Sequence, residues 1–556
     1  MLVLAQKGNY TPLPLKDLSA FENTSSNWSV KGDVSVLPSA NAKLKSKPGE
    51  GILVGTSGEA IISKVKAKDL RFSADFMLAP GASGYVLLPG GQKILISDSY
   101  KDPQIGTSTS GFAGISPIQN ASKAPGLWQN IEINFDASLP DNPKSSRINT
   151  LKINDVTVQE TAYLPVNKLL NADGESFGFK VNSGTMAFRN IGYQLLENSK
   201  PLTVSDLKFK VYKDSWDSKT YEKLDHEGTT KMITQEVTNG LKEFHLVYTG
   251  AIEVSETGEY IFTTIYSGPL CTLEIDGKPV VEGGQSTSQE SHRGNISLSK
   301  GSHSFKLHYA RFPWRSPALG LKVEKAGIRA YDLHMLSSLP VPDPKPYMSV
   351  TPEMKPEMVR SFVLLPGEIA KRTKCISVGS PNGWNYTMDL DRGALVQAWR
   401  GQFADVTEMW YQRGEPQLLY PAGLTVPVSG KSSFAKLAND STIWPDSANV
   451  AFKGYTLNGT GFPAFRYEID NSIVTDELVS SNAGITRTLS KSSGGELFAL
   501  LAEAKKIIEL EKGLFQINDD YFIRTDKKSK VTIRNSVNKQ ELILPFTSQI
   551  SYTLFW

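Results

Sequence analysis

Cysteine is scarce in this chain, and its scarcity excludes several kinds of site. Only Cys271 and Cys375 occur among 556 residues. No CxxC or CxxCH motif is present, which argues against structural zinc and against covalently attached haem. The two cysteines fall in different predicted domains. One interdomain disulfide is therefore an alternative, but we expect two buried thiols.

Long apolar runs and a surplus of charge are also missing. No stretch approaches the roughly 18 apolar residues of a membrane span. The 60 basic and 57 acidic side chains leave a net charge of +3, without a dense Lys/Arg stripe. This balance argues against a nucleic acid as the main partner. With 40% hydrophobic and 21% charged residues, the composition is that of a folded globular protein.

The first seven residues, Met1 to Lys7 (MLVLAQK), are typical of the end of a signal peptide without its charged start. The alternatives are an apolar start to a first strand and a start introduced by cloning. We take the segment to predict a secreted or periplasmic protein. A lipid anchor is not supported, because no lipobox cysteine follows.

Turn residues and alternating apolar residues are abundant. The 45 glycines and 31 prolines are spread throughout, and short alternating runs lie between turn clusters. In each run every second side chain can face a core. This rhythm is typical of sandwiches and barrels and predicts an all-β fold. The clearest runs are residues 69–77, 92–96, 130–135, 259–266 and 304–309.

The length and two breaks in the pattern predict three domains. A chain of 556 residues is too long for one hydrophobic core. A polar stretch at 197–205 ends the first strand-rich region, and residues 337–347 hold four prolines in eleven residues. Such a proline-rich segment stays extended. We expect three consecutive β-sandwich domains at 1–200, 205–340 and 344–556.

One segment is ambiguous between helix and strand. Residues 496–513 (ELFALLAEAKKIIELEKG) are rich in Ala, Leu, Glu and Lys, and their apolar spacing could suit a helix. The segment could equally form two strands, 497–502 and 507–510, around a charged turn. We favour strands because the surrounding sequence alternates.

The first predicted domain resembles the 3-keto-disaccharide hydrolase domain family, whose fold is a concanavalin-like jelly roll. The residues that carry the resemblance are Trp28–Val30, Phe72–Phe76, Gly81–Tyr85, Ile96–Tyr100, Gly111–Gly114, Pro125–Gln129 and Phe188–Ile191. The resemblance implies a base that removes the C2 proton of a 3-keto sugar, expulsion of the C1 substituent, and addition of water. It also implies a cation or oriented donors to stabilise the enolate.

This domain departs from the family pattern. Gln92–Leu95 stands where the family usually has a Glu and a Gln, and Leu88 replaces a common Arg. The domain has no histidine, since all six lie between 226 and 334.

The catalytic candidates that remain in this domain are Asp98, Asp75 (at a family Glu position) and Arg189. Asp98 has the alternative role of capping a turn at a strand end. Trp128 is a candidate for stacking on a sugar, with core or rim packing as its alternative.

The second predicted domain resembles the protective-antigen-type (PA-14) domain, a β-sandwich often attached to glycosidases and adhesins. The carrying residues are Phe244–Gly250, Val254–Phe262, Leu273–Val280, Leu298–His303 and Leu319–Leu321. Within them, Asp276–Gly277 predicts a type I′ hairpin. Members that bind sugar through calcium use adjacent aspartates, but Ser267–Leu270 stands there, so calcium is not supported and no cofactor is predicted.

Two further expectations concern the same domain. His303 and His308 lie five apart on a predicted strand, face opposite sides, and cannot hold one metal together. We expect all six histidines to be structural or surface residues. The loop 309–315 packs aromatic and cationic groups together, and its Trp314 is a candidate substrate-binding residue.

The third predicted domain holds a dense set of aromatic and charged residues. The stretches 383–394, 399–405 and 410–414 resemble a β-rich region of large exported bacterial proteins, and a supersandwich-like fold is our expectation for it. Aromatic rings stack on sugars while charged groups hold hydroxyls. The candidate substrate-binding residues are Trp384, Trp399, Arg400, Trp410 and Arg413. The alternative is a sandwich core with Trp399 buried and Asp389–Gly393 as a hairpin turn.

Two functional hypotheses follow. The first is an exported carbohydrate-handling protein that binds a glycan or glycoside, with lyase or hydrolase action on 3-keto-glycosides in the first domain. The second is a non-catalytic surface or periplasmic protein for adhesion or complex assembly with other exported proteins. The missing Glu, Gln and Arg favour the second, and the family resemblance favours the first.

Overall fold

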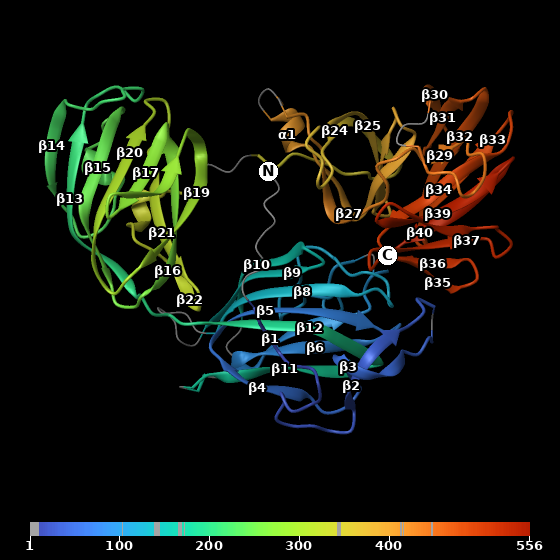
Figure 1. The fold of residues 1–556 in the computed structure, drawn as a ribbon, viewed down its shortest axis with the longest axis horizontal. Coiled ribbons are helices and arrows are strands. Elements are labelled where there is room, and N and C mark those ends of the chain that lie inside the picture. Colours follow the sequence, from blue (N-terminus) through green and yellow to red (C-terminus); the bar gives the residue numbers. More distant parts are fainter. Residues whose placement is uncertain are drawn as a thin grey trace. The chain divides into compact units, whose positions relative to one another are not determined.

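The computed structural model describes residues 10–39, 41–102, 104–137, 145–164, 170–171, 173–341, 346–411, 414, 416–445 and 449–556. These residues form antiparallel sheets (Figure 1), so the all-β prediction is confirmed. The chain divides into two compact units, one with residues up to Gln194 and Pro346–Trp556, the other Leu195–Lys345. The limits of the three domains and their finer fold names stay predictions.

Helical structure in the described residues is confined to short turns. These are α1 (Thr407–Trp410) and the 3₁₀ turns η1 (Pro89–Gly91), η2 (Gln235–Thr238) and η3 (Leu336–Ser338). None of the helices in the described part of the chain has the length and apolar character needed to cross a membrane.

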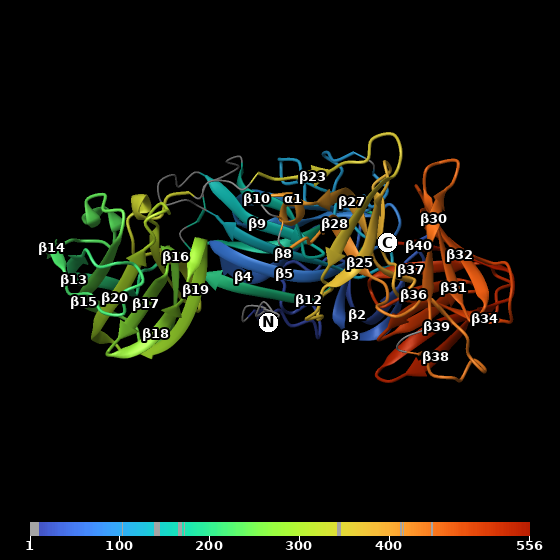
Figure 2. The ribbon, with the colours of Figure 1, turned by 90° about the horizontal axis from the view of Figure 1, so that it is seen from above.

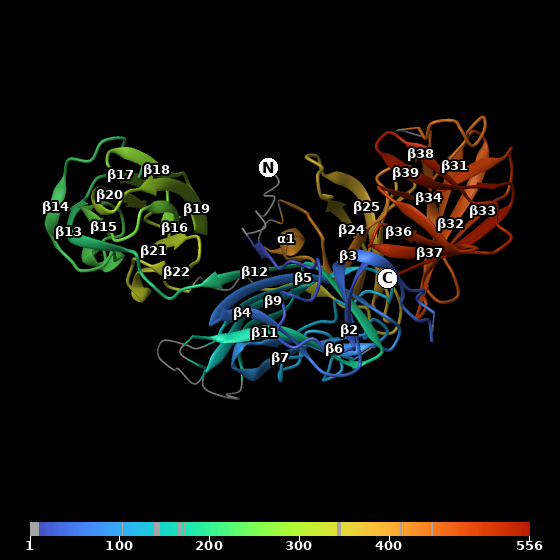
Figure 3. The ribbon, with the colours of Figure 1, turned by 60° about the horizontal axis from the view of Figure 1, so that its bottom comes forward.

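The N-terminal sandwich has two layers, which are seen edge-on in Figure 3. The larger sheet consists of β1 (Thr11–Pro12), β2 (Trp28–Ser35), β3 (Lys45–Thr56), β5 (Asp69–Leu78), β8 (Gln129–Asp136), β9 (Ser146–Ile153), β10 (Val156–Leu164) and β12 (Thr185–Leu196). The smaller sheet consists of β4 (Ile61–Ala67), β6 (Ser83–Leu88), β7 (Gln92–Ser97) and β11 (Glu175–Ser183), in the order β4–β11–β6–β7.

Every second side chain along the strands is apolar and points into the space between these two layers. On β5 the side chains of Phe72, Ala74 and Phe76 are fully buried, while Ser73 and Asp75 between them stay partly exposed. Because successive side chains point to opposite faces, Asp75 lies on the outer face of the larger sheet.

The unit Leu195–Lys345 is a second sandwich. One sheet consists of β13 (Leu202–Tyr212), β14 (Leu224–Thr229), β15 (Phe244–Val254), β17 (Leu270–Ile275), β18 (Lys278–Gly283) and β20 (Gly301–Arg311). The other consists of β16 (Gly258–Gly268), β19 (Ser286–Leu298), β21 (Leu319–Lys325) and β22 (Ile328–Asp332). Asp276 and Gly277 both have positive φ between β17 and β18, which confirms the predicted hairpin turn.

The C-terminal region has three sheets. The first consists of β23 (Ser349–Val350), β24 (Glu357–Val363), β25 (Arg372–Gly379), β26 (Trp384–Asp389), β27 (Ala394–Asp405) and β28 (Tyr420–Pro427). The second consists of β29 (Phe434–Ala435), β34 (Leu497–Ala504), β38 (Thr532–Ser536) and β39 (Lys539–Phe546). The third consists of β30 (Ala451–Leu457), β31 (Pro463–Ile469), β32 (Ser472–Ser481), β33 (Gly484–Lys491), β35 (Ile507–Glu511), β36 (Leu514–Ile517), β37 (Tyr521–Thr525) and β40 (Gln549–Phe555).

Residues 496–513, which could form a helix or two strands by sequence, lie in this C-terminal region. β30, β31 and β32 lie side by side in the third sheet (Figure 2). Residues 497–504 and 507–511 form β34 and β35, so the prediction of two strands is confirmed. Leu497 to Ala502 are all buried, because β34 lies in the second sheet with both faces covered.

The two cysteines are free and buried, which confirms the prediction of two thiols. Burial raises the pKa of the Cys271 thiol well above its ordinary value, and burial also raises the pKa of Cys375 to about 12. The thiolate is the reactive form. We therefore expect neither thiol to react with Ellman's reagent at pH 8 in the native protein, and both to react after unfolding in guanidinium chloride. Titration of one thiol in the native state would contradict this.

Candidate functional site

Asp98 lies directly after β7, at the edge of the smaller sheet of the N-terminal sandwich. The Gly81 N–H donates a hydrogen bond to its Oδ2 (2.8 Å), and its own N–H donates to the carbonyl of Ala82 (2.9 Å). Gly81 has a φ of 72°, a conformation that favours glycine. Asp98 thus caps the turn between β5 and β6, whereas the sequence alternative placed its cap at the turn after its own strand.

The second carboxylate oxygen of Asp98 has a different environment. Oδ1 is shielded from solvent and accepts no hydrogen bond from the described residues. Burial raises the pKa of Asp98, although the Gly81 hydrogen bond and Lys101 oppose the shift, and Asp102 adds to it. An unpaired, desolvated carboxylate oxygen with a raised pKa is suited to accept a proton.

A set of serine hydrogen bonds fixes the chain beside Asp98. The Ser97 N–H donates to Ser110 Oγ (2.9 Å), and the Ser110 N–H donates to Ser99 Oγ (3.2 Å). The hydroxyls of Ser99 and Ser122 are 2.8 Å apart and share a hydrogen bond. These bonds tie the loop that follows β7 back onto the strand, so the position of Asp98 is held from both sides.

Asp75 and Arg189 form an ion pair on the outer face of the larger sheet. Arg189 Nε donates to Asp75 Oδ2 (3.1 Å), and the same oxygen accepts from Asn190 Nδ2 (2.7 Å). Asn130 Nδ2 donates to the other oxygen (3.3 Å). Three donors therefore occupy the Asp75 carboxylate, which leaves it poorly placed to act as a base.

Arg189 is also engaged on its other sides. Its Nη2 donates to Asp519 Oδ2 (3.3 Å) in the turn between β36 and β37, and its guanidinium carbon lies 4.1 Å from the centroid of the Trp128 ring. Trp128 is buried, and the guanidinium covers one face of its ring. No contact among the described residues joins Asp98 to Asp75 or Arg189, so the predicted catalytic residues lie in two separate groups.

The tryptophans of the C-terminal region differ in exposure. Trp399 is fully buried, its Nε1 donates to the Phe403 carbonyl (2.7 Å), and its ring is parallel to that of Phe403. Trp384 is buried with its edge against Trp556. These two rings present no free face to a ligand, which favours the packing alternative. Trp410, on α1, is 53% exposed.

Arg400 is a half-buried cation with no salt-bridge partner in the described part of the chain. Its guanidinium lies 5.6 Å from the Trp384 ring and makes no hydrogen bond or ion pair with the described residues. Burial lowers the pKa of Arg400 to about 10, partly opposed by Tyr100 and Asp102. Arg400 thus lies within electrostatic reach of the segment that follows Asp98. The remaining candidate, Arg413, lies outside the described residues.

Trp314 lies in the loop after β20 and is 61% exposed. Its ring is stacked on that of Phe312 at 5.0 Å, and the ring of Trp216 meets both edge-on. Sequence reasoning did not single out Trp216. Its only signal is a large aromatic residue within the polar loop between β13 and β14.

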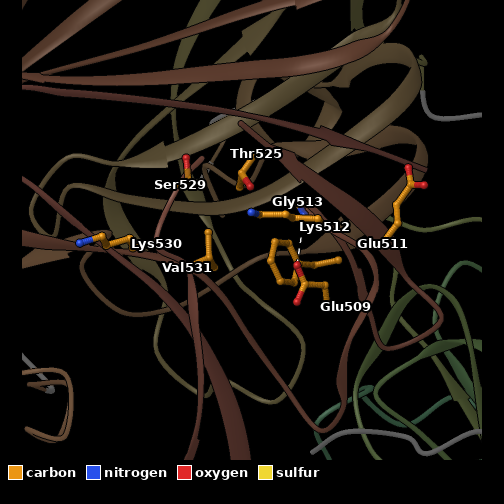
Figure 4. Close-up of a pocket in the computed structure, with 9 residues that line it drawn as sticks. Glu509, Glu511, Lys512, Gly513, Thr525, Ser529, Lys530 and Val531 are labelled. Atoms are coloured by element: carbon orange, nitrogen blue, oxygen red, sulfur yellow. Dashed lines mark hydrogen bonds between the residues drawn. The ribbon is translucent and has the colours of Figure 1, made fainter. Parts of the chain in front are cut away.

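An open hollow of about 520 Å³ lies in the C-terminal region. Figure 4 shows Lys512, Thr525 and Ser529 around it, with the Gly513 N–H donating to Glu509 (3.1 Å). Its lining mixes lysines and glutamates and includes none of the predicted site residues. Within the described residues, no group of three or more His, Cys, Asp and Glu side chains is placed to hold a metal ion.

Residues 16–193 match the family model of the 3-keto-alpha-glucoside-1,2-lyase-like domain, which covers the N-terminal sandwich. No curated protein matches the chain.

Among solved structures, a "putative glycosyl hydrolase" from Parabacteroides distasonis is 18% identical, with 34% of this chain and 100% of that one covered, at a TM-score of 0.24. A beta-glucosidase from Kluyveromyces marxianus, solved with glucose, is 19% identical over 22% of this chain and 16% of its own (TM-score 0.18). An anti-sigma factor domain-containing protein from Clostridium clariflavum is 15% identical over 47% and 99%, respectively (TM-score 0.21).

Proposed function

We propose that this is an extracytoplasmic carbohydrate-handling protein whose N-terminal sandwich acts on 3-keto-glycosides, with Asp98 as the base. The match of residues 16–193 to a lyase-like domain supports the class of chemistry. The single observation that carries the role of Asp98 is its unpaired carboxylate oxygen, since Asp75 is occupied by three donors.

The proposed reaction uses the acidity that a C3 ketone confers on the C2 proton. The Asp98 carboxylate takes this proton, and the C–H electron pair moves to form a C2–C3 double bond with negative charge on the C3 oxygen. Re-formation of the ketone then drives the pair into a C1–C2 double bond and expels the C1 substituent. The leaving oxygen takes up the proton that Asp98 removed, so the aglycone departs as an alcohol and the carboxylate is regenerated.

The enolate oxygen needs a cation or oriented donors. Arg189 lies between two carboxylates, whereas Arg400 has no ion pair among the described residues and is electrostatically coupled to Tyr100 and Asp102 after Asp98. These contacts support Arg400 over Arg189 as the stabilising cation. The unit Leu195–Lys345 serves, in this proposal, as a protective-antigen-type domain that holds the glycan.

The test is incubation of the protein with the α and β anomers of p-nitrophenyl 3-keto-glucoside and with the unoxidised p-nitrophenyl glucosides. We expect nitrophenol release from the keto sugar alone, because the unoxidised sugar lacks an acidic C2 proton. Absence of release from either anomer of the keto sugar would reject the catalytic proposal.

A non-catalytic role in binding or complex assembly is the second candidate. The observation that favours it is that Arg189 bridges Asp75 and Asp519, which gives these positions a role in joining parts of one compact unit. Glycan binding on an array, without turnover of any keto sugar, would support this candidate over the first.

A further inference from the structure

We infer that Trp314 and Trp216 form a stacking subsite for an uncharged pyranose ring. The inference rests on the part of the proposed function in which the unit Leu195–Lys345 holds the glycan. It concerns the unit Leu195–Lys345 alone and needs no catalysis by the N-terminal sandwich.

The rings of Trp216, Phe312 and Trp314 form an aromatic platform with one open side. Phe312 is buried and supports Trp314 from below, at 5.0 Å between centroids and 21° between ring planes. Trp216 closes one flank, with its ring at 5.4 Å and 81° to that of Trp314. Because 61% of Trp314 is exposed, its surface away from Phe312 is accessible to a ligand.

Hydrogen bonds hold the Trp216 side of the platform in place. Glu243 accepts from the Trp216 N–H (2.8 Å) and from Ser215 Oγ (3.0 Å). Asp214 accepts from the N–H groups of Glu222 (3.0 Å) and Lys223 (2.8 Å), which closes the same loop. The backbone that carries the Trp216 ring is therefore held in place by hydrogen bonds.

The Trp314 side is held in the same way. Arg311 Nε donates to the Arg315 carbonyl (3.0 Å), and its Nη1 donates to the Leu241 carbonyl. The Arg315 N–H donates to the Phe312 carbonyl (3.3 Å). A loop that is ordered in the free protein loses less conformational entropy on binding, which raises the affinity that a ring on it can supply.

The chemistry of the platform favours a sugar over other partners. A flat, exposed indole matches the C–H face of a pyranose, and nearby polar groups can bind its hydroxyls. The rim carries both signs of charge, with Arg311 and Arg315 against Asp217 and Glu243, so neither an acidic nor a basic sugar is selected. Three rings are also far too few for a stable protein interface of about 800 Å² per partner.

The test is native affinity electrophoresis of the full chain in gels that contain laminarin, hydroxyethyl cellulose or soluble starch. We expect at least one of these neutral glucans to retard the parent. Trp314→Ala is expected to raise the dissociation constant at least tenfold, because a central aromatic anchor is lost. Trp314→Phe should retain part of the affinity, since it keeps an aromatic face.

Tyr163→Ala serves as the matched control, because Tyr163 is 57% exposed but lies in the N-terminal sandwich. It should bind like the parent. Unchanged affinity of Trp314→Ala, or the absence of retardation of the parent by all three glucans, would overturn the inference. Both results come from the binding assay and do not depend on nitrophenol release. The catalytic proposal is therefore tested separately from this inference.

Discussion

Replacing Asp98 by asparagine is expected to lower kcat on the 3-keto-glucoside at least ~100-fold, which is the low end of what a general base contributes. Asparagine cannot accept the C2 proton, but its side-chain oxygen can still accept the Gly81 N–H that caps the turn. The loss should therefore appear in kcat with the fold intact. Steady-state kinetics and a circular-dichroism melt of parent and variant measure the two quantities.

The same substitution is expected to stabilise the protein at neutral pH. The pKa of Asp98 is raised in the folded state, so ionisation on folding is unfavourable. The stability that protonated Asp98 contributes is present below its unfolded pKa of about 4 and is lost as the pH rises through the higher folded value. Asp98→Asn should thus gain up to about 1 kcal/mol at pH 7, since the residue is only partly buried, and the gain should vanish below about pH 4.

Asp17→Asn is the matched control. Asp17 also caps a turn, but it is exposed, and hydrogen bonds from the Ser19 hydroxyl and N–H lower its pKa. Its replacement should neither raise stability at pH 7 nor change turnover. A loss of stability in Asp98→Asn together with unchanged kcat would mark Asp98 as a turn residue only.

The all-β fold could be predicted from the sequence because strand alternation is local. Phe72, Ala74 and Phe76 define one buried face within five residues, and turn residues mark the ends of each run. Local pattern left residues 496–513 open between a helix and two strands, and the alternation of the surrounding sequence favoured the strands that β34 and β35 confirm.

The candidate site could be predicted only in part, because exposure and pairing are not local. Trp399 and Trp314 are each followed by an arginine in the sequence. Trp399 nevertheless lies buried in a strand, whereas Trp314 lies exposed in a loop. Arg189 meets Asp519 from 330 positions away, and no spacing rule relates the two. The position of Asp98 was found because its strand end carries a family motif, but its unpaired oxygen depends on the loop after β7.

Asp476→Asn is expected to destabilise the C-terminal region by about 3–5 kcal/mol, the cost of leaving a buried charge without its partner. Asp476 and Arg487 are 0% and 1% exposed, and Arg487 donates to both carboxylate oxygens (2.9 and 2.5 Å). Burial alone would lower the pKa of Arg487, but Asp476 and Tyr552 outweigh it and hold the pKa above its ordinary value. In the variant Asp476 no longer offsets burial, but the guanidinium stays charged at neutral pH because arginine is not deprotonated in proteins. Guanidinium chloride unfolding, followed by tryptophan fluorescence, measures the loss.

A double variant separates the cost of an unpaired charge from the loss of the contact itself. Asp476→Leu with Arg487→Met removes both charges and should recover most of the stability, because apolar pairs of similar volume often replace buried ion pairs without loss. Asp391→Asn breaks the exposed pair with Lys374 (2.7 Å) and should stay within about 1 kcal/mol of the parent. If Asp476→Asn also stayed within that range, the Arg487 charge would have to be solvated in the folded protein. The sheet that contains β32 and β33 would then be open to water at its centre, which is incompatible with the burial of the pair.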